Sequence, residues 1–264
     1  MTAQDGEWNQ VSRKRGRIRH VPAPTLREKD TATGAATAEP VAGVRPNPTP
    51  EFTLDQIISH HDVVRQEWET SECWRVLSET LSQALSSPGR PAITRAICLG
   101  PGPYEPSNGS AAARRTAHMQ TAAFCSIVDK IESVSKHKIK SIIQEPAFTS
   151  VDKEFCSKKG LEVVETPAAF SLIDENTLLY GIHIELPTYH EALSKLPGVF
   201  MGVGLSDWES LGDFDKTIKD LLGPFQEMDS KYDKFEFPNL DYIFFGTVIY
   251  WKKEEDDPKE VNDS

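Results

Sequence analysis

The stretch that decides the fold class is residues 97–102, ICLGPG. An apolar segment that runs directly into a Gly-x-Gly turn is typical of the first strand of an open α/β sheet, which ends beside a ligand. The first glycine permits a tight turn, the second permits close approach of a backbone or an anionic ligand, and the next helix would point its positive end at the same crevice. The stretch therefore predicts a ligand pocket, although a tight turn without a ligand would use the same two glycines.

The rest of the chain alternates between helical and extended patterns. Apolar residues recur at helical spacing after Thr53 and again after Ser71, so two amphipathic helices precede the sheet. Strands separated by helices need crossover connections, which favour a mainly parallel sheet covered on both faces. The predicted fold class is α/β, a Rossmann-like three-layer sandwich with a mainly parallel sheet, preceded by two helices and a disordered N-terminal arm. After the two helices we expect strand 93–99, helix 114–133, strand 139–145, helix 150–159, strands 161–165 and 177–184, helix 188–195, strand 198–204, helix 213–222, and a last strand 241–252 placed antiparallel at an edge.

Composition divides the chain of 264 residues into three parts. Residues 20–50 are rich in Pro, Ala and Thr and hold almost no large apolar side chains, which is typical of a disordered linker. We therefore expect a disordered basic and Pro-rich arm over residues 1–50, one α/β domain over 51–252 and an acidic disordered tail over 253–264. A domain of this length can bury one sizeable core.

The net charge of −11 limits the partners. Residues 51–251 carry 18 Lys and Arg against 29 Asp and Glu, and this acidic balance argues against broad binding of nucleic acid or anionic membranes by the globular part. The basic run at 13–19 is the one place where a weak nucleic-acid contact or a nuclear-import signal is expected. A solvated basic tail is the alternative interpretation of that run.

The cysteines indicate the compartment. Cys73, Cys98, Cys125 and Cys156 are scattered, without a Cys-x-x-Cys pair and without a secretory signal peptide ahead of them. No apolar run approaches the roughly 20 residues that span a bilayer. We expect a cytoplasmic or nuclear location, or both, and no membrane association.

Ligands of doubly wound sheets lie beyond the carboxyl ends of the strands, and this rule selects the candidate ligand-binding residues. A carboxylate at the end of the second strand is suited to holding ribose hydroxyls, although here it follows the glycine turn at 43 residues, about twice the usual spacing. Two alternatives stay open. Thr149 and Asp152 also fit a helix capping box, and a histidine such as His183, in the expected strand 177–184, is often bonded to a neighbouring carbonyl. The candidates are Gly100, Gly102, Tyr104, Glu145, Thr149, Tyr180 and His183.

No motif of a known reaction accompanies these candidates. Because His60 and His61 are adjacent in a helix, they point about 100° apart and cannot hold one metal ion together. The chain contains no His-Glu-x-x-His, no Gly-x-Ser-x-Gly and no phosphate-binding P-loop motif, so we expect no metal site and no catalytic residue. Cys98 is read as a small buried hydrophobic residue.

Three segments together resemble the SRR-like domain family, which is named for the plant protein sensitivity to red light reduced. They are ICLGPG at 97–102, EPAFTSVDKEFCSKKGLEVVE at 145–165 and TLLYGIHIELPTYHEAL at 177–193, and the resemblance covers about residues 60–251. Members commonly have Asp where this chain has Glu145, and Pro-His-Cys where it has Ile182-His183-Ile184.

The resemblance implies regulation rather than a defined reaction. Its members are connected with light and circadian-clock signalling in plants and with haem synthesis in animals, and no agreed catalytic activity comes with the family. The resulting prediction is an intracellular regulatory protein that binds a small ligand or a protein partner, with the ligand, cofactor and partner unidentified. The alternative is an enzyme that uses a nucleotide-type cofactor, such as a methyltransferase-like protein.

Overall fold

The computed structural model describes residues 52–212 and 215–253. The predicted arm over residues 1–50, with its basic run, lies outside the described residues. The same holds for nearly all of the predicted acidic tail and for residues 213 and 214, where a helix was expected to begin.

A seven-stranded sheet forms the centre of the domain. The strands are β1 (Arg95–Leu99), β2 (Lys140–Gln144), β3 (Glu162–Val163), β4 (Thr177–Gly181), β5 (Val199–Val203), β6 (Tyr232–Glu236) and β7 (Thr247–Lys252). Their order across the sheet is β3-β2-β1-β4-β5-β7-β6, with β1 to β5 parallel and β7 antiparallel to both of its neighbours. After β3 the chain returns to the other side of β1, so the strand order reverses between β1 and β4. Such a reversal is the switch point of a doubly wound sheet.

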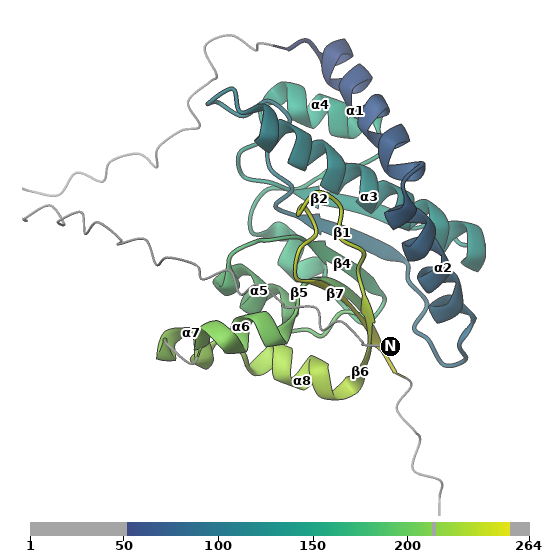
Figure 1. Ribbon diagram of the computed structural model, residues 1–264, viewed down its shortest axis with the longest axis vertical. Helices are drawn as coiled ribbons and strands as arrows, with labels where there is room; N and C mark the ends of the chain where they lie inside the picture. The colour runs from purple at the N-terminus through teal and green to yellow at the C-terminus, as the bar shows by residue number, and fades with distance from the viewer. Residues whose placement is uncertain (1–51, 213–214, 254–264) are drawn as a thin grey trace, which may run out of the picture. The chain divides into compact units, whose positions relative to one another are not determined.

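Helices cover both faces of this sheet, which completes the three layers (Figure 1). One face carries α1 (Leu54–Glu69), α2 (Glu72–Ser86), α3 (Ala111–Ser135) and α4 (Ser150–Lys158). The other carries the 3-10 helix η1 (Ala168–Leu172), α5 (Leu186–Leu193), α6 (Leu205–Gly212), α7 (Lys216–Asp220) and α8 (Gly223–Lys231). The predicted Rossmann-like α/β class with two preceding helices is confirmed.

Local capping explains where two of the predicted helices begin. The Thr53 hydroxyl accepts from the Gln56 amide while the Gln56 side chain accepts from the Thr53 amide, a reciprocal capping box. Thr149 and Asp152 form the same arrangement at the start of α4, with the Asp152 carboxylate 2.8 Å from the Thr149 amide. The capping-box interpretation of Thr149 is therefore confirmed.

The C-terminal third differs from the sequence-based expectation. The expected edge strand 241–252 begins only at Thr247, and it lies between β5 and β6 rather than at an edge. The edge strand on this side of the sheet is β6, whose polar sequence YDKFE gave no strand signal because part of an edge strand faces water. Within the helix expected at 213–222, the described residues form only the short α7, and two helices that were not expected, α6 and α8, lie before and after it.

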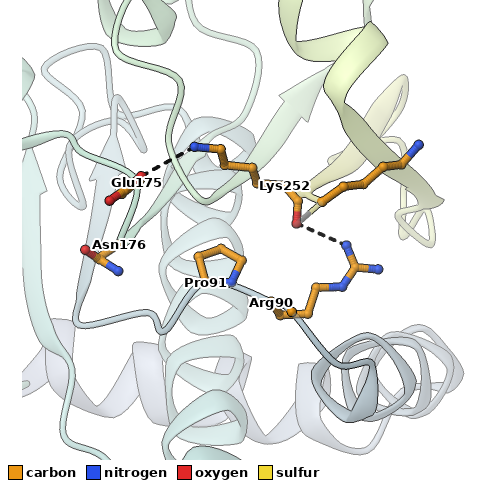
Figure 2. Close-up of a pocket in the computed structure, with 7 residues that line it drawn as sticks. Arg90, Pro91, Glu175, Asn176 and Lys252 are labelled. Carbon is orange, nitrogen blue, oxygen red and sulfur yellow. Dashed lines mark hydrogen bonds and ion pairs between the residues drawn. The ribbon is translucent and has the colours of Figure 1, made fainter. Parts of the chain in front are cut away.

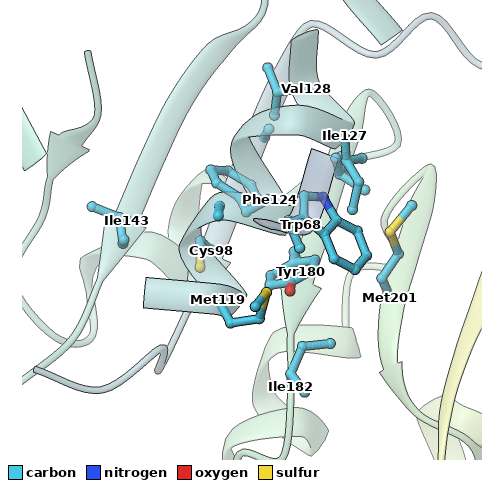
Figure 3. Packing of buried hydrophobic residues seen from close by; sticks show 14 of the residues in the cluster. Trp68, Cys98, Met119, Phe124, Ile127, Val128, Ile143, Tyr180, Ile182 and Met201 are labelled. Carbon is cyan, nitrogen blue, oxygen red and sulfur yellow. The ribbon is translucent and has the colours of Figure 1, made fainter. Parts of the chain in front are cut away.

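The alternation of side chains along the central strands builds two separate cores. Cys98 and Tyr180 point toward α3, where they pack among Phe124, Trp68 and Met201 (Figure 3). Their neighbours on the same strands point to the other face, toward α5 and α8. Because the period of a strand is two residues, this division settles which side chains near the strand ends can share a site.

A buried histidine pair lies where α1 crosses α3. His61 and His118 are fully buried, with their Nδ1 atoms 3.4 Å apart, and the His60 ring lies 4.8 Å from the His118 ring. Burial, assisted by Lys159, lowers the pKa of His61 to about 3, and burial assisted by His61 lowers the pKa of His118 to about 2. Both imidazoles are therefore neutral in the folded protein at neutral pH.

We expect the folded state to lose stability as the pH falls below about 6.5. The unfolded chain binds protons at these histidines below pH 6.5 while the folded chain does not, so stability is complete above that pH and is lost below it. Each histidine contributes a loss of up to about 1.4 kcal/mol per pH unit. Urea unfolding at pH 7, 6 and 5 measures this slope.

The double variant His61→Gln, His118→Gln should have a shallower slope than the wild type. His137→Gln removes an exposed imidazole and serves as the control. A double variant with the wild-type slope would contradict the assignment of the pH dependence to this pair.

Candidate functional site

A cavity of about 550 Å³ opens at the carboxyl ends of β1, β2 and β4, beside the switch point of the sheet. This is the position where doubly wound sheets bind ligands. Three of the predicted residues line it: Gly100, Glu145 and His183. We call it the switch-point pocket.

The glycine turn beside this pocket has no free N–H group to offer a ligand. Pro101 and Pro103 have no amide hydrogen, the Gly100 amide donates to the Gln144 carbonyl at 2.9 Å, and the Gly102 amide donates to Glu145 Oε2 at 3.0 Å. Neither amide is free to bind an anionic ligand, which was one of the uses expected for this turn. The turn is instead fastened to the end of β2.

The two glycines are needed for reasons inside the protein. Both have positive φ, +63° at Gly100 and +87° at Gly102, a conformation that side-chain-bearing residues rarely adopt. A Cβ on Gly100 would lie 2.6 Å from Cγ2 of Ile184. The close approach at this glycine is thus to a neighbouring side chain.

The helix after the turn does not direct its N-terminus at the pocket either. α3 begins at Ala111, nine residues after Gly102, and the Ser110 hydroxyl caps it by accepting from the Ala113 amide. No residue of α3 lines the pocket. The predicted helix-dipole contribution to the site is absent from the described residues.

Glu145 joins the turn to the pocket wall. Its Oε2 accepts from Gly102 and its Oε1 accepts from the Ala147 amide at 2.8 Å. Each carboxylate oxygen accepts more than one hydrogen bond, so both retain capacity for a hydroxyl or ammonium donor of a ligand.

His183 lies on the opposite wall, and its setting differs from the prediction. β4 ends at Gly181, so His183 is an exposed residue of the following loop with a φ of +55° rather than part of the strand. Its Nε2 lies 2.7 Å from the Phe245 carbonyl. A carbonyl can only accept, so Nε2 carries the hydrogen and Nδ1 is left as an acceptor. The alternative of a carbonyl-bonded histidine is confirmed.

The structure does not bring Tyr104, Thr149 and Tyr180 to this pocket. Tyr104 is fully buried on the α3 side, where its hydroxyl lies 2.9 Å from that of Thr121. Thr149 caps α4, and Tyr180 is buried against Phe124 at 5.6 Å between ring centroids.

The candidate list from the sequence omitted five polar residues of the pocket: Gln144, Thr166, Glu185, Thr188 and Glu191. Gln144 is only 4% exposed, and its Oε1 accepts from the Ala169 amide at 3.0 Å. The Ala169 N–H can bond only to the oxygen of the Gln144 carboxamide. The Nε2 group of Gln144 is therefore directed away from Ala169, and no described residue accepts a hydrogen bond from it. Its place as the last residue of β2, directly before Glu145, was the available signal.

The polar lining of the switch-point pocket is therefore acidic. Glu145, Glu185 and Glu191 contribute carboxylates, and no lysine or arginine occurs among the described residues that line it. Apolar surface comes from Pro146, Pro167 and Phe170 among others. The side chains of the pocket offer carboxylate acceptors, the Gln144 carboxamide and the hydroxyls of Thr166 and Thr188, without a lysine or arginine.

A second cavity of about 500 Å³ lies at the opposite end of the strands (Figure 2). Its basic side chains are held within the protein: Arg90 donates to Asp233 and to the carbonyls of Trp251 and Lys252, and the Lys252 ammonium lies 3.5 Å from Glu175. We interpret these contacts as a clamp that fixes the last strand to the segment before β1.

The described residues show no metal centre and no membrane span. In residues 52–212 and 215–253, no group of three or more His, Cys, Asp and Glu side chains is placed to hold a metal ion. None of the helices in the same part of the chain is long and apolar enough to cross a membrane.

Comparisons with known proteins come from sequence and from structure. A family model described as the SRR1 domain matches residues 69–259. No curated protein matches the sequence significantly.

Several solved structures resemble the chain at low identity. Protein 1320 of Thermoplasma acidophilum is 10% identical, with 75% of this chain and 98% of that chain covered and a TM-score of 0.35. The N-methyltransferase NodS of Bradyrhizobium japonicum is 9% identical, with 71% and 99% covered and a TM-score of 0.35. A complex of the Haloferax volcanii Trm112 methyltransferase activator with a putative methyltransferase is 11% identical, with 75% and 97% covered and a TM-score of 0.34.

Replacing Glu145 tests its role in fastening the turn. We expect Glu145→Ala to lower the free energy of unfolding by about 1–3 kcal/mol, because the partly buried Gly102 amide loses its acceptor. Glu145→Gln keeps one oxygen for Gly102 and should remain close to the wild type, while the exposed Ala147 amide turns to water. Denaturant unfolding measures both variants.

The matched control is Glu175→Ala, which removes an exposed carboxylate from the opposite cavity. An exposed ion pair of this kind contributes at most about 1 kcal/mol. Equal losses in Glu145→Ala and Glu175→Ala would show that the carboxylate does not hold the turn.

Proposed function

Because the chain belongs to the SRR1 domain family, we propose that it is a regulatory protein that binds a small ligand in the switch-point pocket. The observation that carries the proposal is the acidic lining of that pocket beside a turn without a free amide. The proposed ligand is neutral or positively charged, presents hydroxyl or ammonium donors and has no phosphate.

The exclusion of phosphate follows from two properties of the site. Phosphate sites in doubly wound folds use free backbone N–H groups at a glycine turn and a helix N-terminus, and neither is available to the pocket here. In addition, a phosphate would approach the carboxylates of Glu145, Glu185 and Glu191 without a lysine or arginine from the lining to balance them. Both properties disfavour a dinucleotide or a nucleoside triphosphate.

The acceptors of the pocket define the groups that the ligand should carry. Glu145 has lone pairs left for a hydroxyl pair, and the Nδ1 atom of His183 accepts one further hydrogen bond. Gln144 supplies the one buried donor, which suits a carbonyl or a ring nitrogen of the ligand. A nucleoside without phosphate combines all of these groups.

The family suggests which processes the ligand would control. Regulation of clock signalling or of haem synthesis, in the cytoplasm or nucleus, belongs to this proposal, and free cysteines suit a reducing compartment. Haem carries two carboxylates of its own, which three pocket carboxylates would repel. We therefore propose that any effect on haem synthesis does not work through haem bound in this pocket.

An enzyme that uses a methyl donor is the second candidate. S-Adenosylmethionine has a sulfonium cation, ribose hydroxyls and no phosphate, so the same acidic lining favours it over a dinucleotide. The two candidates share the ligand class and differ in whether the bound molecule is converted.

Binding of matched compounds tests the proposal. We expect S-adenosylmethionine and adenosine to stabilise the protein in thermal unfolding and ATP and NAD to bind at least tenfold more weakly, because of the charge of the pocket. A ligand at 100 times its Kd adds about 2.7 kcal/mol of stability. Release of S-adenosylhomocysteine would favour the enzyme over the regulator.

Glu145→Gln should weaken the binding of the cationic S-adenosylmethionine more than that of adenosine, because the substitution removes a negative charge and keeps one hydrogen-bond acceptor. Glu175→Gln in the opposite cavity is the control. Tighter binding of ATP than of adenosine, or no stabilisation by any of the four compounds, would overturn the proposal.

A further inference from the structure

The loop between β6 and β7, residues 237–246 (Figure 1, yellow), is joined to the switch-point pocket through His183, whose Nε2 lies 2.7 Å from the Phe245 carbonyl. Three of its residues, Phe237, Ile243 and Phe244, are buried, and the Phe244 ring packs 5.3 Å from Trp68 and 5.0 Å from Phe237. The loop is therefore anchored in the core and is not a free surface segment.

Further contacts hold the loop from several parts of the chain, among them the Cys73 thiol of α2, which lies 3.2 Å from the Asn239 carbonyl. Asp241 forms an ion pair of 3.1 Å with Arg115 of α3, and the Gly246 carbonyl accepts from the Gly204 amide, which follows β5, at 3.1 Å. Another is the bond of His183 to the Phe245 carbonyl. His183 thus belongs both to the pocket wall and to the support of the loop.

The anchored loop nevertheless presents two large aromatic side chains to solvent. Tyr242 is 80% exposed and Phe245 is 62% exposed, and they are the only aromatic residues among the large exposed apolar ones of residues 52–212 and 215–253. The backbone of both Asp241 and Tyr242 is in the left-handed conformation, with φ of 50° and 63°. Non-glycine residues in that region cost about 1–3 kcal/mol each, and such strain is concentrated at functional sites.

An unpaired carboxylate lies beside the loop at Gly246, the residue that follows Phe245. The Asp207 carboxylate lies against Gly246, 2.8 Å from the position of a Cβ there, and no described residue forms an ion pair with it. Asp241 is already paired with Arg115. A flat cation is the ligand group that both an aromatic face and an adjacent carboxylate attract.

We propose that Tyr242 and Phe245 form a stacking surface for a flat, positively charged ring, next to the switch-point pocket. This inference deepens the proposed function and rests on it for the absence of phosphate from the ligand. The loop supplies the ring recognition, the pocket supplies the acceptors for hydroxyls, and His183 connects the two.

7-Methylguanosine is a suitable probe, because it has a cationic flat base, ribose hydroxyls and no phosphate. Guanosine is its uncharged counterpart. We expect the wild type to bind 7-methylguanosine more tightly than guanosine in isothermal titration calorimetry. Phe245→Ala and Tyr242→Ala should each weaken the binding of 7-methylguanosine about 5- to 100-fold, the usual effect of removing one stacking ring.

Matched variants separate stacking from general effects. Phe245→Trp keeps an aromatic face and should keep the affinity, whereas Phe245→Leu keeps apolar volume without the face and should lose it. Val63→Ala removes another exposed apolar side chain, far from the loop in sequence, and should have no effect. All three substituted positions are exposed, so thermal unfolding should show wild-type folding.

The outcomes distinguish the stacking surface from the pocket. Weaker binding in Glu145→Gln with wild-type binding in both alanine variants overturns the surface and keeps the proposed function. Weaker binding in the alanine variants with wild-type binding in Glu145→Gln keeps the stacking surface and overturns the pocket as the binding site. Phe245→Leu with wild-type affinity, or no binding of 7-methylguanosine by the wild type, overturns the stacking surface.

Discussion

Two backbone amides at the end of β1 constrain the whole site. The turn Gly100-Pro101-Gly102-Pro103 has only two N–H groups, and both donate to the end of β2, one to a carbonyl and one to the carboxylate of Glu145. The turn is thereby closed against β2, and a negative side chain becomes part of the pocket wall. The sequence of this glycine turn is similar to that of an anion-binding turn. In this fold, however, its N–H groups bond within the protein, and the pocket beside it is lined with hydrogen-bond acceptors.

The two-residue period of the strands then limits what can reach that pocket. Tyr180 of β4 points toward α3 and is sealed in the core, while the pocket lies beyond the strand ends, where Gln144, Glu145 and His183 are placed. Residues close in sequence to the strand ends are thus divided between core and site by which face they occupy. Tyr104, in the loop that follows β1, packs with Phe155 and His118 on the α3 side of the sheet.

His183 has the most connected position of the site. Its left-handed backbone turns it out of the line of β4, its Nε2 hydrogen holds the carbonyl of Phe245, and its other ring nitrogen stays open. A group that touches the imidazole from the pocket therefore acts on the support of the β6–β7 loop as well. For the proposed function, this connection is a physical route from the bound ligand to the surface.

The sequence by itself determined the fold class, the central strands and the caps of the helices, because these depend on local periodicity and on short-range hydrogen bonds such as the Thr149–Asp152 box. It also located Glu145 and His183 near a pocket, since strand ends gather at one edge of a parallel sheet. Only the tertiary structure decided that the glycine amides are occupied, that Gln144 faces the cavity and that a loop some 60 residues later supports His183. These contacts join segments far apart in the chain, and no local pattern encodes which donor meets which acceptor across a folded sheet.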